Sequence, residues 1–219
     1  MRRKRKILIL MACILWGLTL SPPRARATLI TIQIEAVVDY VGDPHGYLEG
    51  KVSPGDIITG SYMYESTTPD TNPLERGGRY EHAAAPHGIF LSVGGFDFET
   101  NPGNVDFLIE VENDHPPDDN YFLRSRNNLP LSNAAPVDRI SWHLHDPTGR
   151  ALSSDALPTT APVLDAWQWN ILGFGADRLY GVTGHVSSAI PEPATLLLLG
   201  MGGLFLRKRG RSGISRKPF

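Results

Sequence analysis

Apolar and polar side chains alternate along much of this 219-residue sequence with a period of two residues, and few folds accommodate such a pattern. In residues 29–41, LITIQIEAVVDYV, an apolar residue recurs at every second position from Ile30 to Tyr40. The same alternation returns in VDFLIEVE (105–112) and in RISWHLHD (139–146). A strand of this kind buries one face and exposes the other, as strands of antiparallel sheets do. The pattern therefore predicts an all-β fold.

Further segments extend this prediction over the whole middle of the chain. In GIFLSVGGFDFE (88–99), Gly94 and Gly95 separate two alternating runs, which is typical of a β-hairpin. The other candidate strands are DIITGSYMYE (56–65), DNYFLRS (119–125), WQWNILGF (167–174) and RLYGVTGHVS (178–187). Long loops are expected at 66–78, 112–120 and 146–165. Because no segment reads as an amphipathic helix, we expect one domain, residues 28–189, folded as an antiparallel β-sandwich of jelly-roll type.

The N-terminus has the features of a secretory signal peptide. A basic cluster at 2–6, RRKRK, precedes an apolar run at 7–20, and Ala25 and Ala27 supply small residues at positions −3 and −1 of a cleavage site. We therefore expect residues 1–27 to form a signal helix that signal peptidase removes before Thr28. The alternative is an uncleaved anchor, although 14 apolar residues are fewer than the ~20 that a membrane span needs.

The C-terminus carries a second short apolar segment. Residues 194–206 would span about 20 Å as a helix, against about 30 Å of bilayer hydrocarbon. This segment is marginal as a permanent anchor, and it is apolar on every face, which is unsuitable for a surface helix of a domain. Two prolines and several charged residues flank it: Pro191, Glu192 and Pro193 before it, and Arg207, Lys208 and Arg209 after it. Basic residues at this position favour the cytoplasmic side of a membrane.

This tail resembles the PEP-CTERM sorting signal of exported bacterial proteins. The matching residues are Pro191-Glu192-Pro193, the short apolar helix at 194–200, and the cluster Arg207-Lys208-Arg209. The resemblance implies export across the inner membrane of a Gram-negative, polysaccharide-producing bacterium. It also implies transient anchoring through residues 190–219, processing by an exosortase near the Pro-Glu-Pro, and a final location at the cell surface or outside the cell.

Charge and cysteine content restrict the chemistry of the domain. Residues 28–189 contain 22 Asp and Glu against 8 Lys and Arg, which gives a net charge of −14. Such a domain repels nucleic acids and anionic membranes and attracts cations. The single cysteine, Cys13, lies in the signal peptide, so neither a disulfide nor a cysteine nucleophile is expected in the domain.

Two groups of residues are candidates for binding a metal ion. Asp114, Asp118 and Asp119 gather oxygen ligands suited to calcium, although a solvated turn would contain the same residues. His143 and His145 share one face of a predicted strand and, with Asp146, could bind a transition metal, or they are ordinary exposed histidines.

Three tryptophans are candidates for sugar stacking. Trp167 and Trp169 could form a platform for sugar rings, although core packing is the alternative for both. Trp142 shares its face with apolar neighbours and is expected in the core.

Motifs for hydrolytic or phosphate chemistry do not occur in the sequence, so we expect no enzyme and no cofactor other than calcium. The expected function is that of an exported, non-catalytic protein of the cell surface or extracellular matrix, associated with exopolysaccharide. The alternatives are a carbohydrate-binding module that uses Trp167 and Trp169, an ice-binding or adhesion protein, and a secreted hydrolase.

Overall fold

Ten antiparallel strands and one short 3-10 helix make up the part of the chain that the computed structural model describes, residues 28–72, 76–115 and 117–192. The strands are β1 (Leu29–Gly42), β2 (Ile57–Glu65), β3 (Gly77–His82), β4 (Gly88–Val93), β5 (Phe96–Glu99), β6 (Phe107–His115), β7 (Asp118–Ser125), β8 (Arg139–Asp146), β9 (Trp169–Ala176) and β10 (Tyr180–Pro191). The helix η1 (Leu164–Ala166) precedes β9. Within the described ranges, no helix is long and apolar enough to cross a membrane. The predicted signal helix and C-terminal helix lie outside these ranges.

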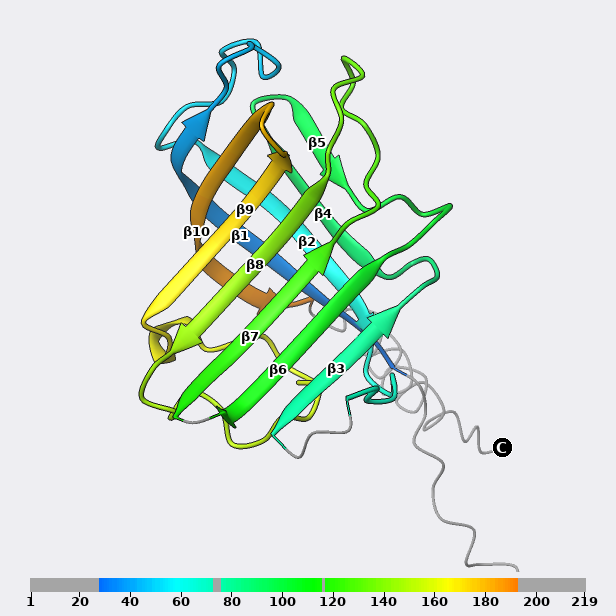
Figure 1. Cartoon of the computed structure of the whole chain (residues 1–219), viewed down its shortest axis with the longest axis vertical. Coiled ribbons are helices and arrows are strands. Elements are labelled where there is room, and N and C mark those ends of the chain that lie inside the picture. The colour runs from blue at the N-terminus through cyan, green and yellow to red at the C-terminus, as the bar shows by residue number, and fades with distance from the viewer. Residues whose placement is uncertain (1–27, 73–75, 116, 193–219) are drawn as a thin grey trace, which may run out of the picture.

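All ten strands belong to one sheet, in the order β3-β6-β7-β8-β9-β10-β1-β2-β4-β5. The sheet curls strongly, so that β3, β6, β7, β8 and β9 form a front layer and β1, β2, β4 and β5 lie behind it (Figure 1). The expectation of an all-β antiparallel fold is confirmed. The expected two-sheet sandwich differs in one respect, because β9, β10 and β1 pair without interruption and join the two layers. Twist accumulated over ten strands allows a single sheet to cover its own concave face.

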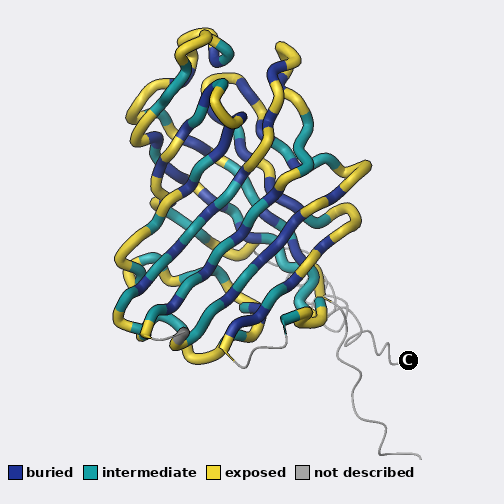
Figure 2. The backbone as a smooth tube through the Cα atoms, in the orientation of Figure 1, coloured by how far each residue is buried: buried dark blue, intermediate teal, exposed yellow. Residues whose placement is uncertain are grey.

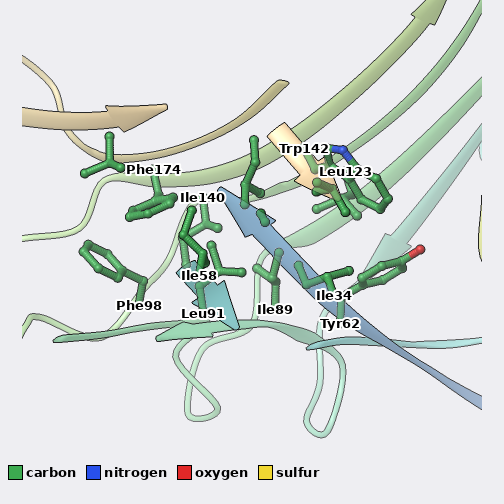
Figure 3. Packing of buried hydrophobic residues seen from close by; sticks show 14 of the residues in the cluster. Ile34, Ile58, Tyr62, Ile89, Leu91, Phe98, Leu123, Ile140, Trp142 and Phe174 are labelled. Carbon is green, nitrogen blue, oxygen red and sulfur yellow. The ribbon is translucent and has the colours of Figure 1, made fainter. Parts of the chain in front are cut away.

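The core fills the space between the two layers. Side chains such as Ile58, Leu91 and Phe98 point from the rear strands toward Ile140 and Trp142 of the front layer (Figure 3). The closest aromatic pair across this space is Phe98 with Phe174, whose ring centroids lie 4.4 Å apart. Trp142 is completely buried, which confirms its expected place in the core. Burial of this contiguous apolar set supplies the main driving force for the fold.

Several polar atoms of the large buried aromatic side chains have hydrogen-bond partners. The indole Nε1 of Trp142 donates to Asn170 Oδ1 at 2.8 Å, and Asn170 Nδ2 donates to the Val186 carbonyl at 2.7 Å. The phenol of Tyr121 donates to the phenol of Tyr62 at 3.2 Å. Because buried polar groups cost free energy when unpaired, these bonds allow large aromatic side chains to occupy the interior.

Burial alternates along the strands, dark blue with lighter colours, as the period of two predicted (Figure 2). One departure occurs in β1, where the pairing with β10 shifts between Glu35 and Ala36 and again between Val38 and Tyr40. The second shift reverses the alternation, because an extra residue in one strand turns the following side chain to the other face. Tyr40 was expected on the apolar face with Val38, but it lies on the outer face and is 63% exposed.

Two loop predictions also differ from the structure. β3 takes up only the last two residues of the expected loop at 66–78 and continues to His82, where no strand was expected, because its residues pair with β6 from Gly77 opposite Glu112 to His82 opposite Phe107. The expected loop at 112–120 is largely replaced by the ends of β6 and β7, which pair as far as His115 opposite Asp118. Segment 146–165, in contrast, is irregular until η1 begins, as expected.

Candidate functional site

The first two residues of the Pro-Glu-Pro segment are part of the folded sheet. Pro191 is the last residue of β10 and lies opposite Ile32 of β1. The Glu192 amide donates to the Thr31 carbonyl at 2.9 Å, and Gln33 Nε2 donates to Glu192 Oε1 at 2.5 Å. Pro193 and the basic residues Arg207, Lys208 and Arg209 lie outside the described residues. The sorting segment therefore begins directly at the end of a strand, without a linker.

The beginning of the domain lies at the same end of the sheet. β1 starts at Leu29, and it runs antiparallel to β10, so Leu29 lies near the point where β10 ends (Figure 1). The Thr28 carbonyl accepts a hydrogen bond from the Ser66 amide at 3.0 Å. Ala25 and Ala27, the predicted cleavage residues, lie outside the described part. Cleavage after Ala27 would leave a single residue before the sheet.

A cluster of polar and aromatic side chains lies on the outer face of the front layer. Strand register sets Asn120 of β7 opposite His145 of β8, and His145 opposite Trp169 of β9. One pair further along, His143 lies opposite Ile171. We call these five residues, Asn120, His143, His145, Trp169 and Ile171, the outer-face platform. Their side chains share this face because residues two apart on a strand point the same way.

Hydrogen bonds fix the orientation of the Asn120 amide within the platform. Asn120 Nδ2 donates to Glu112 Oε2 at 3.0 Å, and a carboxylate only accepts, so Oδ1 points toward the histidines. This oxygen lies 3.0 Å from His143 Nε2 and 3.0 Å from His145 Nδ1. Because an amide oxygen accepts, both ring nitrogens carry protons. Each ring in its neutral form then offers its other nitrogen as an acceptor.

The electrostatics of the platform favour a neutral His143. Burial lowers the pKa of the His143 imidazole below its ordinary value, and the neighbouring His145 lowers it further, while Glu112 opposes both effects. His145 Nε2 lies 4.0 Å from Asp118 Oδ2, and its ring centroid lies 4.8 Å from that of Trp169. The platform therefore combines an aromatic surface with hydrogen-bonding groups whose orientation is fixed.

Trp169 is the most exposed part of the platform, whereas Trp167 is not part of it. The Trp169 side chain is 53% exposed and its outer-face neighbour Ile171 is 48% exposed. Trp167 precedes β9 as the residue that caps η1, and it packs half-buried against the core. The structure therefore separates the two tryptophans that the sequence analysis grouped as a sugar-binding pair.

Two of the three aspartates of the predicted calcium site, Asp118 and Asp119, lie on opposite faces of the sheet. Asp119 is completely buried; its Oδ1 accepts the Asp114 amide at 2.9 Å and its Oδ2 accepts the Leu152 amide at 2.8 Å. Asp118, the preceding residue, lies on the opposite face near His145. Both oxygens of Asp119 thus hold backbone segments together. Calcium binding by these residues stays a prediction.

Asp146 is likewise separated from His143 and His145. It is buried, and its carboxylate accepts hydrogen bonds from the amides of Thr148 and Arg150 at 3.0 and 2.9 Å. The histidines lie on the outer face, so the alternative transition-metal site does not form from these three residues. Across the described ranges, no group of three or more His, Cys, Asp or Glu residues is arranged to hold a metal ion.

An all-β domain that ends in a Pro-Glu-Pro segment, followed by an apolar run and a basic cluster, defines a class of chain with a C-terminal sorting signal. Residues 189–211 match the family described as the PEP-CTERM protein-sorting motif, which confirms the resemblance found in the sequence. The motif implies a bacterial protein that is exported and sorted to the cell surface by an exosortase. No curated protein and no solved structure matched the chain.

Sequence reasoning identified His143, His145 and Trp169 but not their partner Asn120. Asn120 stands where the expected loop at 112–120, with its acidic ligands, overlaps the candidate strand at 119–125. Its role follows from the pairing of β7 with β8, which places it opposite His145. An alternating pattern predicts that a segment is a strand, but it does not predict which strands are neighbours in the sheet.

Proposed function

We propose that this chain is an exported, non-catalytic protein that binds polysaccharide at the cell surface or in the extracellular matrix through the outer-face platform. The observation that carries the proposal is the exposed indole of Trp169, 53% exposed and packed beside the fixed imidazole of His145. Trp169 is not isolated, because it lies beside the exposed Ile171 and the oriented imidazole of His145, and a grouping of apolar and polar side chains of this kind is typical of a binding surface.

The chemistry of the platform suits a sugar ring. One face of a pyranose carries C–H groups that pack on an aromatic ring, and its edge carries hydroxyl groups that exchange hydrogen bonds with planar polar side chains. Trp169 and Ile171 supply the apolar surface. His143 and His145 supply acceptor nitrogens, and their shared bonds to Asn120 hold both rings in place without a ligand.

The non-catalytic part of the proposal rests on how the platform uses its polar groups. The Glu112 carboxylate accepts a hydrogen bond from the Asn120 amide, and the Asp118 carboxylate lies 4.0 Å from His145 Nε2. Both histidines bond to the Asn120 amide oxygen. Glycoside hydrolysis requires two carboxyl groups on opposite sides of a bound sugar. The platform instead consists of an indole, an aliphatic side chain, two imidazoles and an amide, an arrangement that supports binding.

The decisive experiment measures binding of the full-length chain, purified in detergent, to a panel of bacterial and plant polysaccharides. Removal of the indole by Trp169→Ala should lower affinity about tenfold, which corresponds to about 1.4 kcal/mol, in the range of one aromatic contact. Trp169→Phe should retain part of the affinity because it retains a stacking surface.

Phe90→Ala is the matched control. Phe90 is a partly exposed aromatic residue of β4, in the rear layer, and the platform does not include it. It should therefore leave the affinity unchanged. Equal affinity of the wild type and Trp169→Ala for every polysaccharide that binds would contradict the proposal.

A further inference from the structure

A hollow lies on the outer face beyond the platform, across β8, β9, β10 and the end of β1. Its volume is about 410 Å³, and its lining includes Tyr40, Arg139, Gly175, Arg178 and Gly181. The hollow continues the line of the platform along β9, because Trp169, Ile171, Gly173 and Gly175 occupy alternate positions of that strand. None of its residues was selected by the sequence analysis.

Strand register creates the floor of the hollow. Arg139 of β8 lies opposite Gly175 of β9, Gly175 lies opposite Gly181 of β10, and Gly181 lies opposite Gly42 of β1. Three strands therefore contribute a glycine to the same row across the sheet. Because these glycines have no side chains, the row forms a depression in the outer face, whereas side chains cover the backbone in the other rows.

At two glycines that line the hollow, Gly173 and Gly181, the packing of the protein would also allow a larger residue. A Cβ on Gly181 would have no atom within 4 Å, and a Cβ on Gly173 would meet its nearest atom at 3.8 Å, an ordinary contact. Gly175 differs, because its φ of 144° and the nearby Tyr180 carbonyl both exclude a side chain. Glycine at positions 173 and 181 therefore leaves open space above the sheet.

Tyr40 forms an aromatic wall of the hollow. The β1 bulge turns its side chain to the outer face, and its ring lies next to Gly42, where a Cβ would meet the ring atoms at 3.2 Å. The hollow thus has a flat ring beside a floor without side chains. Trp169 and Tyr40 lie at the two ends of this surface.

The charge of the hollow differs from that of the domain. The lining contains two guanidinium groups, of Arg139 and Arg178, and one carboxylate, of Asp177. Neither arginine makes an ion pair within the described residues, whereas Arg79 makes two. The domain has a net charge of −14, so two arginines that lie on one surface without ion-pair partners mark a place for an anionic group. Guanidinium groups match carboxylates geometrically, with two parallel hydrogen bonds.

We propose that the hollow is a second subsite, which binds an acidic sugar unit of the polysaccharide held by the platform. This inference rests on the proposed function and names its ligand class, a polysaccharide that contains uronic acid or similarly charged units. A carboxylate of the sugar contacts Arg139 and Arg178, and the sugar ring packs against Tyr40 above the glycines. From Trp169 to Gly175 the strand rises about 20 Å, which is the length of several sugar units.

The test compares polygalacturonate with fully methyl-esterified polygalacturonate, which has the same backbone without the charge. The full-length chain in detergent should bind polygalacturonate at least tenfold more tightly at about 0.15 M salt, where long-range repulsion between the acidic domain and the polymer is screened. Arg139→Gln combined with Arg178→Gln should remove that difference. Arg150→Gln is the matched control, because Arg150 is an exposed arginine outside the hollow. Gly181→Leu should weaken binding of both polymers by filling the hollow.

The outcomes separate this inference from the proposed function. Loss of binding in Trp169→Ala, with the double arginine variant equal to Arg150→Gln, would overturn the second subsite and leave the platform intact. No effect of Trp169→Ala would overturn the proposed function itself. Failure of the wild type to bind polygalacturonate, or equal binding of both polymers, would also overturn the inference. Unchanged melting temperatures of the arginine variants show that these results report on binding.

Discussion

The contacts of individual side chains in this protein depend on which strand lies beside their own. Asn120 fixes the protonated nitrogens of His143 and His145, although the three residues come from two strands. Asp119 joins two segments that are 33 residues apart, through the Leu152 amide. His82, at the end of β3, is buried against Phe107 and within 3.0 Å of Thr68 Oγ1. At this scale, burial decides the chemistry of each group.

His82 makes the stability of the fold depend on pH. Burial lowers its pKa to about 4 from an ordinary value of 6.5, and the neighbouring His87 ring, 4.9 Å away, lowers it further. Between these two values the unfolded chain binds a proton that the folded chain does not, so the free energy of unfolding should decrease as the pH falls from 6.5 to 4. The loss from this group amounts to up to about 3 kcal/mol.

Urea denaturation at a series of pH values measures this dependence. His82→Gln should be less stable than the wild type at pH 7, and its stability should decrease less between pH 6.5 and pH 4. His143 contributes a smaller dependence of the same sign, because its pKa is also lowered. A variant slope equal to that of the wild type in this pH window would show that His82 is not the responsible group.

The strands of this sheet show which features a local pattern can specify. The alternation in RISWHLHD predicted a strand at the bounds that β8 has, Arg139–Asp146. Gly94 and Gly95 form the turn of the β4–β5 hairpin, both with positive φ, as their dipeptide predicted. These successes share one cause: side-chain periodicity and turn geometry are set by residues adjacent in the sequence.

Features that depend on distant pairing could not be predicted in this way. β3 is a strand because β6 lies beside it, and its sequence GGRYEH begins with two residues that disfavour strands. The bulge that exposes Tyr40 depends on the register of β1 with β10, almost 150 residues later. Trp169 could be recognised as a candidate from its residue type, whereas the row of glycines could be recognised only once three strands were aligned.

Gly184 tests the requirement for close approach of β1 and β10. A Cβ at this position would overlap the Val37 carbonyl of the neighbouring strand, so Gly184→Ala should lower the free energy of unfolding by about 2 kcal/mol or more. Gly173→Ala is the control, because its Cβ would make only ordinary contacts; its effect should stay within about 1 kcal/mol. Chemical denaturation measures both, and equal stability of the two variants would contradict this account of the β1–β10 contact.

As a whole, the molecule has an acidic all-β domain that is followed by a sorting motif at 189–211 and preceded by a segment that the sequence predicts to be a signal peptide. The sorting motif at 189–211 overlaps the last residues of β10, so folding and sorting use adjacent parts of the chain. The core, in contrast, draws on every strand of the sheet. Removal of either terminal segment would therefore leave the buried side chains of the domain in place.

Mass spectrometry of the protein recovered from a producing bacterium tests the predicted processing at both ends. The mature chain should begin at Thr28, since Ala25 and Ala27 provide the small residues that signal peptidase requires. Its C-terminus should lie near Pro191-Glu192-Pro193, because the sorting motif implies exosortase processing. Deletion of residues 190–219 is the comparison, and it should remove the C-terminal processing but not the cleavage at Thr28. Recovery of the intact 219-residue chain would contradict both cleavages.

The shared position of the two strand ends gives the domain a base and a tip. Leu29 and Pro191 lie at the base, and β1 rises from there toward Tyr40 over about 35 Å. An attachment to the membrane after Glu192, as the sorting motif implies, would hold the domain by its base. Tyr40 and the glycine row would then lie at the end of the strands that is farthest from the attachment. A polymer outside the bacterium would meet this tip before it reached the lipid.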